Sequence, residues 1–283
     1  MAALRDFVPD GMARLGFGPH PDRARQDAET LLLHVLGENR AWLFAHSDDE
    51  LSVDKAAHYT SLIERRLNGE PIQYLTGEQE FYGLPFHVTP AVLIPRPETE
   101  HLVEKALELA AAFERMRILD VGAGSGAIAI SLACSLPEAR ITAVDISAAA
   151  LAVARKNAER NDVAGRIDFK KSDLLAAVAS EQFQIVVSNP PYVATGDRHS
   201  LSVEVRDHEP ALALFAGEDG LDVYRRLIPA AFAVLTAGGF LLMEIGHGQS
   251  EAITGLLKQA GFERIEFVPD LQGIARVACA QRL

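Results

Sequence analysis

Apolar side chains recur at helical spacing through the first part of the chain. Over residues 22–36 they repeat every three or four positions, and Gly37 follows as a typical helix end. A second pattern of this kind starts after Ser52, a good N-cap residue, and stops at Asn68. The two patterns predict a small bundle of helices, and we take residues 1–75 as an N-terminal helical domain.

Short β-like runs follow at residues 81–88 and 91–94, separated by a Thr-Pro pair. Turn residues between two such runs predict a β-hairpin, which we expect to link two domains over residues 76–95. A helix is then predicted over residues 99–113, because acidic residues in its first turn suit the positive end of a helix dipole.

Beyond residue 116, short apolar runs alternate with amphipathic stretches. Such alternation argues for a mostly parallel sheet covered by helices on both faces. The predicted fold class for residues 96–283 is therefore α/β, with a seven-stranded sheet of Rossmann-like type. Strands are expected at residues 117–121, 140–144, 167–170, 185–188, 240–245, 265–268 and 274–280. Helices are expected at residues 125–135, 148–160, 219–236 and 249–260.

Composition and charge narrow the classes of function. Of the 283 residues, 48% are hydrophobic and 23% are charged, which excludes disorder and coiled coil as the main architecture. The net charge is −12, and the absence of an evident basic cluster argues against direct nucleic-acid binding through phosphates. The cysteines, Cys134 and Cys279, lie far apart and the nine histidines are scattered, so we expect no metal site.

The chain shows no signal for a membrane or for export. No apolar run approaches the roughly 18 residues of a membrane span. The N-terminal stretch Met1-Ala-Ala-Leu-Arg-Asp lacks the basic and then apolar pattern of a secretory leader. We therefore expect a cytoplasmic protein, and we expect it to be a monomer.

The first candidate site is a glycine-rich loop. An apolar strand runs directly into Gly122, Ala123, Gly124, Ser125 and Gly126, and an apolar helix follows. Glycine permits tight turns and lets a ligand approach main-chain N–H groups, and the carboxyl end of a first strand borders the binding crevice of an open α/β sheet. The loop is compatible with a nicotinamide cofactor and with an adenosyl cofactor.

Acidic residues follow the next two predicted strands. Asp145 comes about twenty residues after the loop, as expected for a carboxylate that accepts from ribose hydroxyls. After the third strand, Asp173 is a candidate acceptor for an adenine amino group, and Leu174 is a candidate packing surface for the ring. A helix cap and a core leucine are equally good explanations of that pair.

The second candidate site is the tetrapeptide Asn189-Pro190-Pro191-Tyr192, which ends a β-branched strand beside the same crevice. The prolines fix φ and remove two donors, while the Asn189 side chain adds a carbonyl acceptor. Two fixed acceptors match a planar NH2 group, and a tyrosine ring can cover it. Holding both N–H bonds would turn a poorly nucleophilic nitrogen toward an electrophile such as a sulfonium methyl.

These motifs resemble those of amino-methyltransferases that use S-adenosylmethionine. More narrowly, the chain resembles the bacterial release factor glutamine methyltransferases, a family of protein-(glutamine-N5) methyltransferases. The resemblance covers nearly the whole chain, including residues 69–77, 81–83, 92–100, 209–212, 219–221 and 244–246.

The resemblance implies methylation of the glutamine in the Gly-Gly-Gln motif of class I peptide chain release factors, which modulates translation termination. It implies a substrate-recognising N-terminal domain and S-adenosyl-L-methionine as cofactor, with S-adenosyl-L-homocysteine as product. It places cofactor contacts at residues 122–126, Asp145, Leu174 and Asn189, although the family often has an aromatic residue at the position of Leu174. It places substrate contacts and catalysis at residues 189–192.

Other functions remain compatible with the sequence. A ribosomal-protein glutamine N5-methyltransferase would share these motifs. A nucleic-acid adenine N6-methyltransferase would also hold a planar NH2 group, although the acidic charge argues against it. A nicotinamide oxidoreductase would use the glycine loop and leave residues 189–192 without a role, and a translation adaptor would need neither motif. Residues 193–210 form a long polar connection and a candidate lid.

Overall fold

The computed structural model describes residues 3–113, 116–270 and 272–283. Contacts divide these residues into two compact units. The N-terminal unit holds the described residues up to Glu78 together with Leu201–His208, and the sheet unit holds Gln79–Ser200 and Glu209–Leu283. Met1 and Ala2, with which the N-terminal stretch begins, lie outside the described residues. The domain limits 75 and 95 stay a prediction.

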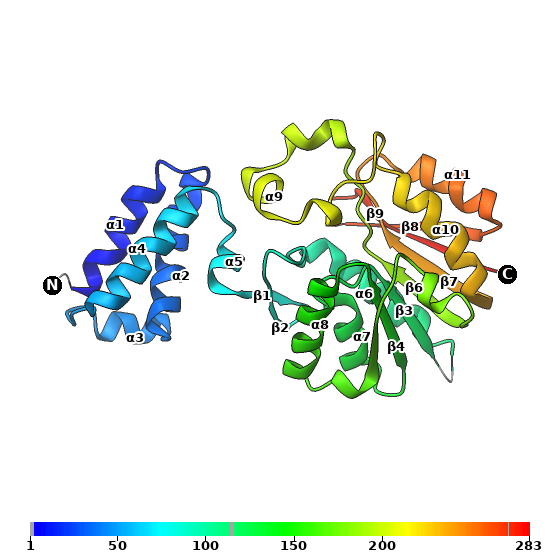
Figure 1. Ribbon diagram of the computed structural model, residues 1–283, viewed down its shortest axis with the longest axis horizontal. Helices are drawn as coiled ribbons and strands as arrows, with labels where there is room; N and C mark the ends of the chain where they lie inside the picture. Colours follow the sequence, from blue (N-terminus) through cyan, green and yellow to red (C-terminus); the bar gives the residue numbers. More distant parts are fainter. Residues whose placement is uncertain (1–2, 114–115, 271) are drawn as a thin grey trace. The chain divides into compact units, whose positions relative to one another are not determined.

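The N-terminal unit is helical (Figure 1). Its helices are α1 (Leu4–Leu15), α2 (Ala24–Leu36), α3 (Arg40–Ala45), α4 (Val53–Leu67), α5 (Ile72–Thr76) and α9 (Val203–His208). The two predicted helices correspond to α2 and α4, and Ser52 caps α4 by accepting from the N–H of Lys55 at 3.4 Å. The sequence patterns did not predict α1, which carries Pro9 in its interior.

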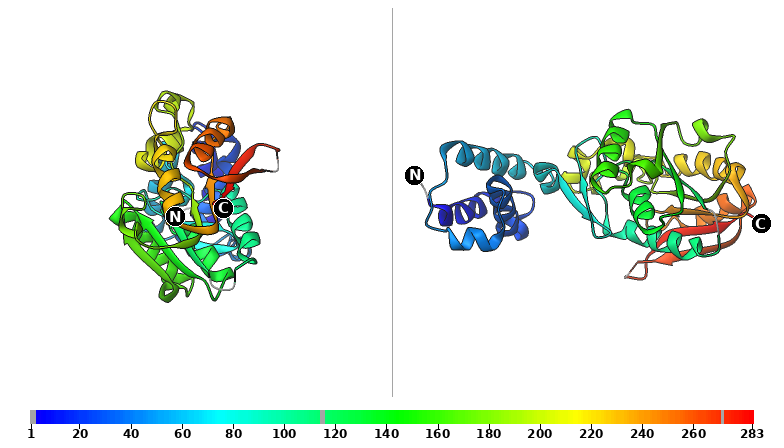
Figure 2. Two further views of the ribbon diagram at one scale, coloured as in Figure 1. Left: turned by 90° about the vertical axis from the view of Figure 1, so that its right-hand side faces the viewer. Right: turned by 90° about the horizontal axis from the view of Figure 1, so that it is seen from below.

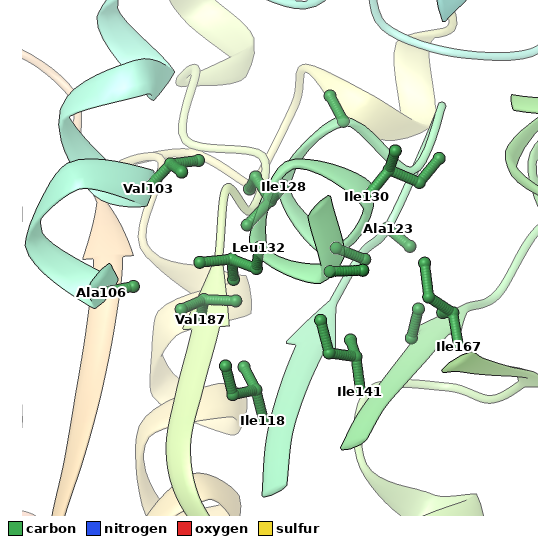
Figure 3. Packing of buried hydrophobic residues seen from close by; sticks show 14 of the residues in the cluster. Val103, Ala106, Ile118, Ala123, Ile128, Ile130, Leu132, Ile141, Ile167 and Val187 are labelled. Carbon is green, nitrogen blue, oxygen red and sulfur yellow. The ribbon is translucent and has the colours of Figure 1, made fainter. Parts of the chain in front are cut away.

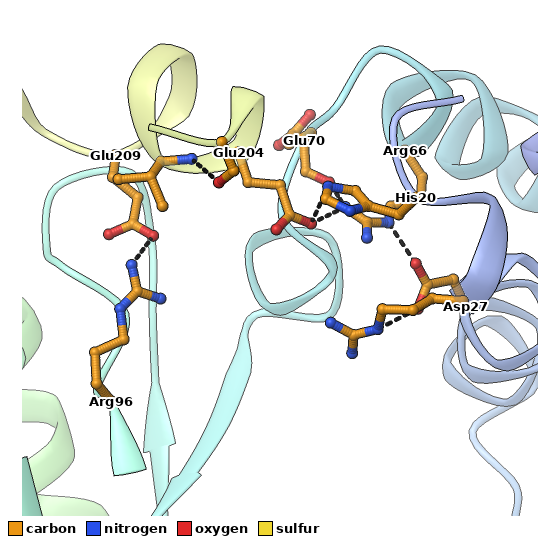
Figure 4. A network of polar contacts seen from close by, with 10 residues as sticks. His20, Asp27, Arg66, Glu70, Arg96, Glu204 and Glu209 are labelled. Atoms are coloured by element: carbon orange, nitrogen blue, oxygen red, sulfur yellow. Dashed lines mark hydrogen bonds and ion pairs between the residues drawn. The ribbon is translucent and has the colours of Figure 1, made fainter. Parts of the chain in front are cut away.

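A buried ion pair joins α2 to α4 in this unit (Figure 4). Arg66 Nε donates to Asp27 Oδ2 at 2.7 Å, and the two side chains are 2% and 3% exposed. The same guanidinium donates to the main-chain carbonyl of Glu70 at 3.0 Å and to the carboxylate of Glu204 in α9. This contact ties the short segment 201–208 to the N-terminal unit.

The hairpin is present, but the prediction for its turn was wrong. It consists of β1 (Glu78–Phe81) and β2 (Leu84–His87). The chain reverses at Tyr82 and Gly83, whose φ angles of 53° and 71° suit the tight turn of a two-residue hairpin loop. Residues 91–94 form no strand, because the chain there turns at residues 90–91 and continues without ladder hydrogen bonds.

The sheet unit contains a seven-stranded mixed sheet in the order β5-β4-β3-β6-β7-β9-β8, and it confirms the predicted α/β class. Its strands are β3 (Arg117–Val121), β4 (Arg140–Asp145), β5 (Ile167–Lys171), β6 (Phe183–Ser188), β7 (Leu235–Glu244), β8 (Glu263–Pro269) and β9 (Ala275–Gln281). All neighbours from β5 to β7 are parallel, whereas β9 is antiparallel to both β7 and β8.

Helices pack on both faces of this sheet (Figures 1 and 2). They are α6 (Glu100–Ala110), α7 (Ala127–Ser135), α8 (Ala148–Arg160), α10 (Asp222–Val234) and α11 (Ser250–Ala260). Alternate strand residues enter two separate apolar clusters, as a strand buried on both faces requires. Ile118 of β3 joins the cluster with α6, α7 and α8 (Figure 3), while Leu119 joins the cluster with α10 and α11.

The order in which the chain connects the strands determines where a ligand site can lie. From β3 the chain steps to β4 and β5 on one side and returns to β6 on the other side of β3. Open α/β sheets bind ligands in the crevice at such a reversal, at the carboxyl ends of the strands. Ser188 Oγ closes this point by donating to the carbonyl of Val121 at 2.7 Å, so the end of β6 lies beside the start of the glycine loop. No helix of the described residues is both long and apolar enough to cross a membrane.

Candidate active site

A cavity of about 280 Å³ opens at the carboxyl ends of β3, β4 and β6, within the sheet unit. Nine of the twelve residues predicted for the site line it: Gly122, Ala123, Gly124, Ser125, Asp145, Asp173, Leu174, Asn189 and Pro191. The other three, Gly126, Pro190 and Tyr192, are not among its lining residues. Gly126 instead supports the packing of α7 on α8, since an added Cβ would lie 3.2 Å from that of Ala154.

The glycine loop is held by main-chain hydrogen bonds. The N–H groups of Gly122 and Ala123 both donate to the carbonyl of Val144, at 2.9 and 3.0 Å. Gly122 and Gly124 have φ angles of 77° and 56°, in the region that favours glycine. An added Cβ on Gly122 meets no protein atom within 4 Å, so it would project into the cavity that this residue lines.

Asp145 organises the loop as well as lining the cavity. Its Oδ2 accepts from the N–H of Gly124 and its Oδ1 accepts from the N–H of Ser147, both at 2.8 Å. A carboxylate has about four lone-pair sites, so acceptor capacity remains for a ligand. The sequence pointed to Asp145 as a ligand contact and did not predict this support of the loop.

Asp173 and Leu174 line the same cavity after β5. Asp173 forms an ion pair with Arg226, whose Nη2 lies 2.7 Å from Oδ2, so part of its acceptor capacity is already used. Leu174 has a φ of 48°, unusual for a residue with a side chain. Leu174 thus lines the cavity with a backbone conformation that is strained for a leucine. Its contact with an adenine ring stays a prediction.

Asp120 is a buried carboxyl beneath the loop. It is 0% exposed, and its Oδ2 accepts from the N–H of Ala129 in α7 at 3.1 Å. Among the residues that the structure describes, Oδ1 has no hydrogen-bond partner. Burial raises the pKa of this carboxyl to about 7; the N–H of Ala129 opposes the rise and the charge of Asp145 adds to it.

We expect the free energy of unfolding to fall more steeply with pH in the wild type than in Asp120→Asn. The native pKa of about 7 lies above the unfolded value, which is about 3.9. Between these values the native state binds more protons, so stability is lost as pH rises through that window. Urea unfolding of both proteins across the window measures the difference, and identical slopes would contradict the assignment.

Both the main chain and the side chain of Asn189 are held in place. It follows directly on β6, and its Nδ2 donates to Thr99 Oγ1 at 3.0 Å. Pro190 is buried behind it, while Pro191 reaches the cavity. The hydroxyl of Tyr192 donates to Glu244 Oε1 at 3.3 Å, and burial raises the pKa of that phenol. The hydrogen bond to Glu244 therefore restrains the ring of Tyr192.

The sequence did not single out Thr99 and Glu244 as site residues. Thr99 precedes α6 and lines the cavity, and Glu244 ends β7; each is 3% exposed. Both fall in segments that carried the family resemblance, but no spacing rule brings together positions 145 apart. Arg96, also on the cavity wall, pairs with the buried Glu209 (Figure 4).

The described residues contain no group of three or more His, Cys, Asp or Glu side chains arranged to hold a metal ion. The polar groups around the cavity are amide, hydroxyl and carboxylate side chains, the guanidinium groups of Arg96 and Arg226, and the N–H groups of the loop. Such groups can bind an organic ligand with ribose hydroxyls and a planar amide, and they can fix the orientation of both.

Comparisons with known proteins agree with this arrangement. The model of the methyltransferase small domain matches residues 99–206, and that of the PrmC N-terminal domain matches residues 18–77. The release factor glutamine methyltransferase of Koribacter versatilis is 46% identical over 259 residues, covering 91% of each chain. That of Moorella thermoacetica is 44% identical over 280 residues, covering 99% of this chain and 98% of its own.

A solved structure supports the fold. The T. thermophilus 16S rRNA methyltransferase in complex with AdoMet and guanosine superposes with a TM-score of 0.55 at 22% identity, over 73% of this chain and 50% of that chain. Similarity at this level of identity concerns the fold alone. The two full-length relatives, by contrast, share almost half of their residues with this protein along nearly its whole length, and the chain therefore belongs to the release factor glutamine methyltransferase family.

Proposed function

We propose that this protein transfers a methyl group from S-adenosyl-L-methionine to the side-chain amide nitrogen N5 of the glutamine in the Gly-Gly-Gln motif of class I peptide chain release factors. The observation that carries this proposal is the side-chain amide of Asn189, held by Thr99 in the cavity wall beside the glycine loop. A fixed amide group beside the glycine-rich loop suits an amide substrate, and the loop suits an adenosyl cofactor.

The residues of the cavity fit such a cofactor. Gly122 and Gly124 leave space that a Cβ would fill, and their N–H groups lie in a loop that lines the cavity. The carboxylate of Asp145 keeps acceptor sites for the ribose hydroxyls. We propose that residues 122–126, Asp145, Asp173, Leu174 and Asn189 hold the cofactor, with Leu174 against the adenine.

The proposed reaction needs orientation more than proton transfer. When bound, the sulfonium supplies its methyl carbon, whose bond to sulfur breaks as the bond to N5 forms and N5 releases one proton to water. We propose that Asn189 Oδ1 and a main-chain carbonyl of the Pro190-Pro191 turn accept from the two N–H bonds of the substrate amide, and that Tyr192 lies against its plane. Alignment of this kind lowers the barrier by removing unproductive orientations.

A substitution in the loop tests the cofactor assignment. We expect Gly122→Ala to weaken binding of S-adenosyl-L-homocysteine by about tenfold or more, equivalent to about 1.4 kcal/mol, because the new Cβ occupies the cavity. Gly83→Ala is the matched control: its φ of 71° imposes similar backbone strain, and it lies in the hairpin turn with no atom within 4 Å. Isothermal titration should find the control unchanged; equal affinities for all three proteins would exclude this position from the cofactor site.

The substrate assignment is tested with methyl-labelled S-adenosylmethionine and a purified class I release factor. We expect label on the Gly-Gly-Gln glutamine, located by mass spectrometry, and none on a release factor with Ala in its place. Parallel reactions with ribosomal proteins and with adenine-containing DNA examine the two competing methyltransferase functions. Label on either of these and not on the release factor would overturn the proposal.

A further inference from the structure

A chain of hydrogen bonds runs from a buried carboxylate to the side chain of Asn189. Glu244 Oε2 accepts from the hydroxyl of Thr99 at 2.5 Å, and Thr99 Oγ1 accepts from Asn189 Nδ2 at 3.0 Å. The second oxygen of Glu244 accepts from Tyr192. The chain therefore connects β7, the start of α6 and the end of β6, three places far apart in the sequence.

Glu244 is a rigid anchor for this chain. It is the last residue of β7 and is paired with Val277 of β9. Its main-chain carbonyl accepts from the hydroxyl of Tyr224 at 2.7 Å, and its side chain is surrounded by the sheet unit with 3% exposure of the residue. Burial raises the pKa of this carboxyl, and the hydrogen bonds from Thr99 and Tyr192 oppose that rise.

The direction of each hydrogen bond follows from the number of protons. A threonine hydroxyl has one proton, and here Thr99 donates that proton to Glu244 Oε2. The oxygen of Thr99 can then act only as an acceptor toward Asn189, so the NH2 end of the Asn189 amide must face it. Consequently Asn189 Oδ1, at the other end of the amide, is directed away from Thr99.

We propose that Thr99 and Glu244 are positioning residues for methyl transfer: the Glu244–Thr99 hydrogen bond fixes the Asn189 amide with Oδ1 toward the substrate amide. This inference rests on the proposed function and adds to it the cause of the orientation. Without the hydroxyl, the Asn189 amide can rotate about its broad terminal torsion. A donor would then face the substrate N–H in part of the molecules, and misalignment of a reacting group costs up to about 100-fold in rate.

Substitutions at Thr99 separate the hydroxyl from the shape of the side chain. We expect Thr99→Val, which keeps the shape, to lower kcat for release factor methylation by about 10- to 100-fold with unchanged affinity for S-adenosyl-L-homocysteine. Thr99→Ser keeps the hydroxyl and should restore most of the lost kcat. Thr236→Val, which removes a hydroxyl that bonds the main chain of Phe183 away from the cavity, is the matched control.

Glu244→Gln supplies a second variant of nearly identical shape. The new amide can donate to Thr99, which frees the Thr99 proton to point at Asn189, so kcat should fall as in Thr99→Val. Wild-type kcat in a folded Thr99→Val or Glu244→Gln protein would overturn the proposal. A Thr99→Ser protein as slow as Thr99→Val would overturn it as well, because shape and not the hydroxyl would then be the cause.

A spectroscopic measurement keeps this proposal separate from the proposed function. In 15N-labelled protein, the side-chain amide protons of Asn189 should exchange slowly with water and faster in Thr99→Val. Unchanged exchange overturns the positioning role even if the wild type methylates release factors. Loss of protection in a protein that methylates no release factor supports the orientation and refutes the proposed substrate.

Discussion

Replacing Asn189 by Ala is expected to lower kcat for methyl transfer by about 100- to 1,000-fold, the range seen when one preorganised hydrogen-bonding group is removed from an active site. Asn189 follows directly on β6 at the reversal of the sheet, and its amide donates to Thr99 Oγ1 at 3.0 Å. The substitution removes Asn189 Oδ1, the proposed acceptor for the substrate N–H, while the strand and the two prolines keep their places.

Binding and folding distinguish this loss from general damage. Affinity for S-adenosyl-L-homocysteine should fall much less than kcat, because the other proposed cofactor contacts, the loop and Asp145, are untouched. The thermal unfolding midpoint should stay close to that of the wild type. Asn68→Ala is the matched control, since this exposed asparagine caps α4 in the N-terminal unit. Single-turnover rates separate the chemical step from product release. An Asn189→Ala protein with more than a third of the wild-type rate would refute a catalytic role.

Local sequence signals were enough for the sheet and for the two loops that follow its strands. The glycine loop, Asp145 and Asn189 each come directly after an apolar run, so the parallel sheet brings them to one edge. Strand ends were harder to predict. The β7 strand begins at Leu235, five residues before the predicted start, because Leu235 pairs with Phe183 although glycines follow it.

Interactions between distant positions could not be predicted in this way. The hydrogen bond from Thr99 to Glu244 depends on α6 lying over the end of β7. The apolar run around Glu244 predicts a buried strand, but it gives no indication of the partner of the Glu244 carboxylate. The hairpin turn at Tyr82 required a positive φ at a tyrosine, whereas the Thr-Pro pair gave the stronger local signal. Residues 193–210, expected as a polar connection, contain the helix α9; their role as a lid remains a prediction.

The attachment of α9 has the same long-range origin. Glu204 reaches Arg66 across 138 positions, and Arg66 is already paired with Asp27 in the interior of the N-terminal unit. Burial of an ion pair offers little net stability, but removal of one partner leaves a buried charge and is costly. Arg66 thus contacts both the interior of the helical unit and the segment 201–208.

Arg66→Met is therefore expected to destabilise the N-terminal unit by about 3–5 kcal/mol, measured as the opening free energy of α2 and α4 amides in hydrogen exchange. Exchange in residues 201–208 should accelerate too. Adding Asp27→Leu removes the stranded carboxylate and should recover most of the loss. Arg65→Met is the control at the neighbouring position. It breaks the more exposed ion pair between Arg65 and Glu70, and it should lower the free energy of unfolding by less than about 1 kcal/mol. If both arginine substitutions lowered the opening free energy equally, burial of the Arg66 ion pair would not be the cause of the larger loss predicted for Arg66→Met.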